Sequence, residues 1–204
     1  MAAHSLSTTL LQLSPQYKIG VGRPQPFLDM ETSLRLLAAA HGSFATFTEK
    51  ELHILDEKAL QALRNGEAER GLEGLAKDGK AYINRDGASV DTLVHELLHC
   101  HAHEDFHQLG RRWVEGATEF LTIEAMTKGG FPATHSYPEE EAIILKLLSS
   151  GYPIAELKTF YFQGGANTLV AHVDRHCYRK FGQVDEAVRH GDWKRARYGL
   201  RQHR

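Results

Sequence analysis

Residues 95–99 read His-Glu-Leu-Leu-His, a spacing that could hold a catalytic metal ion. If these residues form a helix, His95 and His99 lie one turn apart on the same face, where two imidazoles can share one ion. Glu96 then falls beside the metal, where its carboxylate can take a proton from water. The pentapeptide predicts zinc-dependent peptide hydrolysis, but a chain with 13 histidines needs support from the surrounding residues.

The residues around the motif predict a helix with a single polar stripe. Ser89 and Asp91 are good N-cap residues, and an apolar run follows them directly. Apolar side chains flank the histidine face on both sides: Leu93, Val94, Leu97, Leu98 and Cys100. This distribution is typical of a buried helix.

A catalytic zinc site has three protein ligands and an open position. Residues 111–130 predict a second helix, which ends at Gly129-Gly130. Glu115 stands on this helix, 16 residues after His99, and is placed to complete a His/His/Glu set. Glu119, one turn further on, could accept a hydrogen bond from a ligand histidine and fix its tautomer. Solvated helix charges are the alternative interpretation of both glutamates.

The motif, a short loop and then the segment WVEGATEF resemble the gluzincin group of zinc metallopeptidases. In that group a glutamate helix follows the HExxH helix, and here Trp113, Glu115, Gly116, Ala117 and Glu119 carry the likeness. The interval from His99 to Glu115 is similar to that of compact bacterial zincin-like domains, including effector and toxin domains. The specific likeness covers about residues 80–125.

The resemblance implies a zincin-like fold of the α+β class, predominantly helical, with a small sheet before the active-site helix. It implies one Zn²⁺ on His95, His99 and Glu115, with Glu96 as general base and Glu119 supporting the ligands. Gluzincins stabilise the oxyanion with a Tyr or His from the region after the glutamate helix. Tyr137 and His135 are the candidates, Tyr137 ahead; the alternatives are Tyr152, Tyr161, His172 and His176.

Other residues compete for the third ligand position. Asp105 stands where some zincins place that ligand, but their pattern has glycine where this chain has Ala102. His101 and His107 are near in sequence but do not share the face of the motif histidines. His103 does, and is interpreted as a histidine at the end of the helix.

The chain predicts an extended N-terminal arm over residues 1–30 and a single catalytic domain over 31–204. The domain has a part ending in the motif helix, 31–104, and a helical part, 105–204. Further helices are expected at 30–41, 48–64 (with a Thr48/Glu51 capping box), 138–150 (with a Ser136/Glu139 capping box), 153–162, 166–180 and 192–198. Residues 67–79 are expected to form a broken helix or loop. Residues 80–85 predict a strand, which could either be an exposed edge that aligns an extended substrate or merely complete a small sheet.

Composition bears on which partners and which cellular location are expected. With 24 Lys and Arg against 26 Asp and Glu, the formal net charge is −2, so no nucleic-acid partner is expected, although the last dozen residues are locally basic. No apolar run reaches membrane-spanning length, and the first residues do not form a convincing signal peptide. Two cysteines, Cys100 and Cys177, suit a reducing cytosol. The expected location is the cytoplasm, or outside the cell after export without a cleavable signal.

The sequence therefore predicts a zinc metallopeptidase that acts on a peptide or protein. One alternative is a bacterial secretion-system effector or toxin with an unknown hydrolytic target, for which an immunity or delivery partner is expected. A second alternative is a non-catalytic module in which zinc joins two helices, but such sites normally have four protein ligands.

Overall fold

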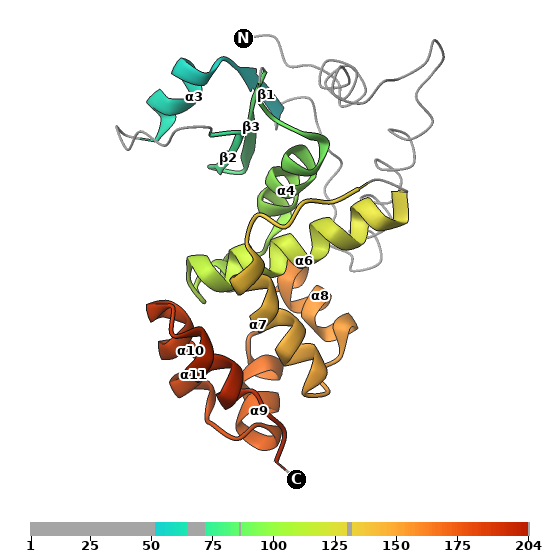
Figure 1. Ribbon diagram of the computed structural model, residues 1–204, viewed down its shortest axis with the longest axis vertical. Helices are drawn as coiled ribbons and strands as arrows, with labels where there is room; N and C mark the ends of the chain where they lie inside the picture. The colour runs from blue at the N-terminus through green and yellow to red at the C-terminus, as the bar shows by residue number, and fades with distance from the viewer. Residues whose placement is uncertain (1–51, 65–71, 86, 130–131, 204) are drawn as a thin grey trace. The chain divides into compact units, whose positions relative to one another are not determined.

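The computed structural model describes residues 52–64, 72–85, 87–129 and 132–203 (Figure 1). The arm predicted at 1–30 and the helix predicted at 30–41 lie outside these residues, as does the capping box Thr48/Glu51. The described residues fall into two compact units. The first comprises 52–101 and 122–134, and the second comprises 102–121 and 135–203. The prediction of a single catalytic domain over 31–204 stays a prediction.

The first unit contains a three-stranded sheet in the order β1-β3-β2 (Figure 1). β1 (Leu52–Leu55) pairs in parallel with β3 (Lys80–Asn84), and β2 (Gly74–Lys77) pairs with β3 in the antiparallel sense. A parallel pair needs a crossover, and the segment that includes helix α3 (Glu57–Leu63) makes it. The helix starts at Asp56, whose side chain accepts a hydrogen bond from the N–H of Ala59 at 2.8 Å.

Two predictions about this unit are wrong. Residues 52–55 form a strand instead of belonging to one helix through 64, because they pair with β3 and Asp56 starts a new helix. Residues 74–77 form a strand where a loop or broken helix was expected. The strand at 80–84 is confirmed, but it is the central strand among the described residues and cannot be the exposed edge.

The motif helix is α4 (Val90–His101), which packs on β2 and β3. The predicted N-cap is confirmed, because the hydroxyl of Ser89 accepts the N–H of Thr92 at 3.3 Å. The apolar residues on both sides of the histidine face are buried: Leu93, Val94, Leu97 and Leu98. Cys100 is half-buried, and neither cysteine forms a disulfide.

His103 does not end α4 as predicted. It lies beyond the helix as the N-cap of the short helix α5 (Glu104–His107), where its Nδ1 accepts the N–H of Asp105 at 3.2 Å. The glutamate helix is α6 (Arg111–Gly129), as the sequence predicted. It contributes to both units, since the boundary between them falls after Leu121.

The second unit is helical. It contains α7 (Pro138–Ser149), α8 (Ile154–Gln163), α9 (Asn167–His176), α10 (Phe181–His190) and α11 (Trp193–Gly199). Helix α10 was not predicted, although its buried Val184, Ala187 and Val188 follow the helical period. Trp113, only 1% exposed, donates its indole N–H to Asp185 at 3.0 Å and so ties α6 to α10.

The start of α7 differs from the predicted capping box. Its N-cap is Tyr137, which makes no side-chain cap hydrogen bond, and Pro138 stands at the first helical position as predicted.

Helices and one small sheet are the regular elements of the described residues, which confirms the α+β, predominantly helical class. Within those residues, no helix is both long and apolar enough to cross a membrane.

Candidate metal centre

The structure brings three of the predicted site residues together. One ligand atom from each of His95, His99 and Glu115 lies within 4.8 Å of the other two. His95 is 7% exposed, His99 is half-buried, and the side chain of Glu115 is 14% exposed. Among the described residues, this is the one group of three or more histidine, cysteine or acidic side chains so arranged.

The two histidines approach each other through their Nε2 atoms. Their Nε2 atoms are 3.0 Å apart, with the ring planes inclined at 72°. Two imidazole nitrogens bound to one tetrahedral zinc ion at its usual bond length would lie about 3.3 Å apart. The pair is therefore spaced like two ligands of one ion, and the spacing follows from their positions one turn apart on α4.

The donor set also fits zinc in its chemistry. Two imidazole nitrogens and one carboxylate oxygen make a three-ligand set of the kind found in catalytic zinc sites, which keep a further position open. Burial of the ligands in a site of low dielectric strengthens their attraction to a cation. The residues present thus fit the predicted ion.

The side chain of Glu96, which belongs to α4, packs closely against Gly74 of β2. A Cβ atom built on Gly74 would lie only 2.6 Å from Cγ of Glu96 and 2.9 Å from its Oε1. The same atom would lie 2.9 Å from Cγ2 of Thr92. Gly74 therefore makes room for the Glu96 side chain, and any larger residue there must displace it.

A buried carboxylate holds the start of α4. Asp91, 6% exposed, accepts hydrogen bonds from the hydroxyls of Ser89 and Thr134 and from the N–H of Thr134, the last at 3.1 Å. Burial alone would raise the pKa of Asp91, but these hydrogen bonds outweigh it and lower the pKa below its ordinary value. Asp91 therefore stays ionised and attaches the segment around Thr134 to the motif helix.

Arg111, which the sequence analysis did not select, approaches two of the predicted residues. Its Nε lies 3.4 Å from Oε1 of Glu115, one helical turn away. Burial lowers the pKa of the Arg111 guanidinium, but the charge of Glu115 and a hydrogen bond with Tyr137 more than compensate and raise it. The i, i+4 spacing of Arg111 and Glu115 was the signal that could have identified this pair.

Glu119 is buried, as expected of a residue that supports a site. Its Oε1 accepts the backbone N–H of Ser136 at 2.6 Å and that of Tyr137 at 3.4 Å. It thereby caps the turn that leads into α7 and fixes the backbone of an oxyanion candidate. Its predicted hydrogen bond to a ligand histidine stays a prediction.

Gly116 explains how α6 and α7 approach each other. A Cβ atom there would collide with the backbone carbonyl of Glu140. The glycine between Glu115 and Ala117 therefore allows the first turn of α7 to lie directly on α6. This close approach brings Tyr137, at the N-cap of α7, next to the side of α6 that carries Arg111.

The second oxyanion candidate has a different partner. Nδ1 of His135 lies 2.8 Å from Oε2 of Glu141, and its side chain is 59% exposed. Glu141 orients this ring at the start of α7. The structure thus holds both candidates in place, His135 by a carboxylate and Tyr137 by Arg111 and Glu119.

The rival ligands do not belong to the cluster of His95, His99 and Glu115. Asp105 accepts the N–H of Gly165 at 3.1 Å and does not belong to the cluster. His107 is exposed. Burial lowers the pKa of His101 to about 4, so this ring is neutral at pH 7.

The alternative oxyanion residues contact one another or the core of the second unit. The Tyr161 hydroxyl lies 2.7 Å from that of Thr118. The ring of His172 lies at a tilt to those of Tyr152 and His176, with centroids 5.2 and 5.0 Å away. These contacts give each of them a structural role.

Comparisons with models of protein families, with curated proteins and with solved structures gave no match to this chain.

Proposed function

We propose that this chain is a zinc-dependent hydrolase of peptide bonds. The observation that supports the proposal is the convergence of His95, His99 and Glu115, whose ligand atoms lie within 4.8 Å of one another. The two histidines come from one helix and the glutamate from another, so tertiary structure was needed to bring the set together. If the pentapeptide had arisen by chance, there would be no reason for a third ligand to lie this close to the two histidines.

His95, His99 and Glu115 would hold the ion. When bound, zinc supplies a Lewis acid that polarises a carbonyl and lowers the pKa of water. Three protein ligands leave room for water and substrate, which distinguishes this set from a closed structural site. Nε of Arg111 lies 3.4 Å from Oε1 of Glu115, so the guanidinium and a bound cation would share this carboxylate.

Glu96 is the residue proposed to move the proton. It would accept a proton from the attacking water and return it to the leaving amine, as a general acid–base catalyst does. Its position next to the first histidine places it on the ligand helix, and Gly74 leaves space for its side chain. This close packing restricts the carboxylate to few orientations, which favours a catalytic role over that of a solvated surface charge.

Negative charge that develops on the carbonyl oxygen needs hydrogen-bond donors in addition to the metal. Tyr137 is the stronger candidate, because Arg111 lies beside its hydroxyl and Glu119 fixes its backbone. His135 is held by Glu141 and is the second candidate. Glu119 and Glu141 are positioning residues in this scheme.

The test compares Glu96→Gln with wild type, both zinc-loaded, on a library of fluorescence-quenched peptides. We expect Glu96→Gln to keep its zinc and to lose hydrolysis by about 10²–10⁴-fold, the range typical of a general base. Glu57→Gln, an exposed residue on α3, is the matched control and should retain full activity. If the zinc-loaded Glu96→Gln variant hydrolyses the peptides as fast as wild type, the proposal is contradicted. That result would favour a non-catalytic zinc ion that only joins two helices.

A further inference from the structure

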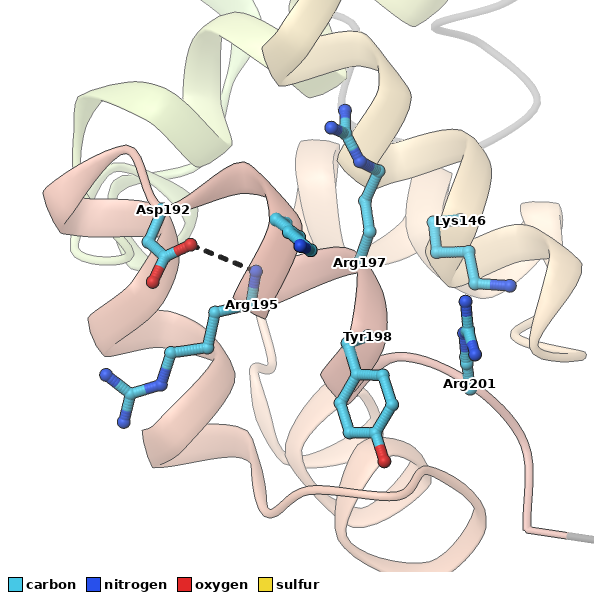
Figure 2. A pocket seen from close by; sticks show the side chains of 7 residues that line it. Lys146, Asp192, Arg195, Arg197, Tyr198 and Arg201 are labelled. Carbon is cyan, nitrogen blue, oxygen red and sulfur yellow. Dashed lines mark hydrogen bonds between the residues drawn. The ribbon is translucent and has the colours of Figure 1, made fainter.

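A second feature of the molecule is a strongly basic pocket on the second unit. It has a volume of about 670 Å³ and is lined by Lys146, Asp192, Lys194, Arg195, Arg197, Tyr198 and Arg201. Figure 2 shows Lys146 reaching in from α7, while the other labelled side chains come from α11 and the residues on either side of it. Five of the seven lining side chains carry a positive charge, although the whole chain has a net charge of −2.

The single acidic residue of the lining does not neutralise this charge. Asp192 is the N-cap of α11, and its side chain accepts the N–H of Arg195 at 3.0 Å (Figure 2). This carboxylate is therefore engaged with the start of its own helix, where it also interacts favourably with the helix dipole.

Two of the arginines already bind carboxylates at the surface. Arg197 lies 2.5 Å from Oε2 of Glu139, and Arg195 lies 3.4 Å from Oε2 of Glu186. All four side chains are more than 40% exposed, and exposed pairs of this kind contribute only about 0–1 kcal/mol. Carboxylates of a ligand could replace them at little cost.

The remaining cations have no ion-pair partner within the part of the chain that the structure describes: Lys146, Lys194 and Arg201. The guanidinium of Arg201 lies over the ring of Tyr198, with Cζ 5.2 Å from its centroid. The ring covers one face of the guanidinium and leaves its N–H edges available, the geometry in which arginine binds carboxylates. Tyr198 is itself 40% exposed.

We propose that this pocket binds an acidic segment of a partner protein, with several Asp or Glu side chains spaced along it. The cations come from α7, from α11 and from the residues after α11 (Figure 2), which suits a ligand with distributed charges. Binding of nucleic acid uses many phosphate contacts along an extended positive surface, whereas these five cations line one pocket of about 670 Å³. A short acidic peptide matches the size and charge of the pocket better.

The proposal does not depend on the metal centre, because the lining of the pocket contains none of the proposed ligands. Charge attraction of this kind acts mainly on the association rate and weakens as salt is added. Binding should therefore be strong at low ionic strength and decrease steadily with salt.

The experiment measures fluorescence anisotropy of a labelled peptide of alternating glutamate and glycine, titrated with the full chain. We expect saturable, salt-sensitive binding that Lys194→Gln/Arg201→Gln weakens at least about tenfold. The matched control is Lys58→Gln/Lys80→Gln, which removes the same charge from exposed residues of the first unit and should bind like wild type. Thermal unfolding of both variants checks that the fold is intact.

Three results would overturn the proposal. The first is absence of binding to the acidic peptide at low salt. The second is an equal loss of affinity in both double variants, which would mean that the net charge of the chain, and not the pocket, determines binding of the peptide. The third is tighter binding of a labelled oligothymidylate of the same charge, which would assign the pocket to nucleic acid.

Discussion

The two units of the molecule hold their site carboxylates by different physical means. In the first unit Glu96 lies in a space that exists because position 74 has no side chain. In the second unit Glu115 is paired with Arg111, one turn away on the same helix, at 3.4 Å. Glu96 packs closely against a strand, and Glu115 has a positive charge beside it.

This difference corresponds to the roles proposed for the two residues. A general base must be held where it can reach the proton of the attacking water. A metal ligand must be ionised before the metal binds, and an arginine beside it favours that ionised state. Packing against Gly74 restricts where the Glu96 carboxylate can lie, and Arg111 supplies a positive charge beside Glu115.

Gly74→Ala tests the steric side of this comparison and should have the larger effect. The added methyl group must displace Glu96, because its Cβ would lie 2.6 Å from Cγ of that residue. A shift of about 1 Å in a catalytic group can reduce turnover about 10²-fold, so we expect a loss of kcat of that order with zinc content unchanged. Steady-state kinetics and metal analysis measure the two quantities.

The control for this variant is Gly182→Ala in α10, where an added Cβ meets no atom within 4 Å. It should leave kcat unchanged. Normal kcat in Gly74→Ala would show that the contact does not position Glu96.

Asp91→Ala should have a smaller effect, on the stability of the first unit. It removes the acceptor for Ser89 and Thr134, and loss of a buried, ionised acceptor typically costs about 1–3 kcal/mol. Because the folded-state pKa of Asp91 is lowered, its contribution is present at neutral pH and is lost as pH falls through that pKa. Denaturant unfolding of the metal-free chain from neutral to acid pH measures this.

Asp91→Asn provides the matched comparison, since it keeps the shape and one acceptor oxygen but cannot ionise. We expect intermediate stability at neutral pH and a flatter acid dependence than in wild type. Wild-type stability of Asp91→Ala at neutral pH would show that the attachment to Thr134 is energetically unimportant.

The part of the site that could be predicted lies within single helices. The spacing of His95 and His99 specifies their shared face, and the shared face accounts for the 3.0 Å separation of their Nε2 atoms. Glu115 could be selected because it stands on the next predicted helix, 16 residues after His99. Helical periodicity likewise predicted α4, α6, α7 and α8, with small errors at their ends.

The rest depends on contacts between distant segments, which local patterns do not contain. The strand at 52–55 forms because it pairs with β3, although its residues also fitted a helix. β3 is central because Gly74–Lys77 adds a further strand beyond it. The contact of Glu96 with Gly74 spans two elements in the same way, so no spacing in the sequence could show it.

The most direct test of the account is the zinc content of three purified proteins: wild type, Glu115→Ala and Glu124→Ala. Glu124 lies on the same helix and pairs with Lys128 at 2.9 Å, so its replacement controls for the loss of a helical glutamate. After extensive dialysis, mass spectrometry should find about one zinc per chain in wild type and Glu124→Ala and a clear loss in Glu115→Ala. Zinc retained by Glu115→Ala, or absent from wild type, would contradict the His95/His99/Glu115 site.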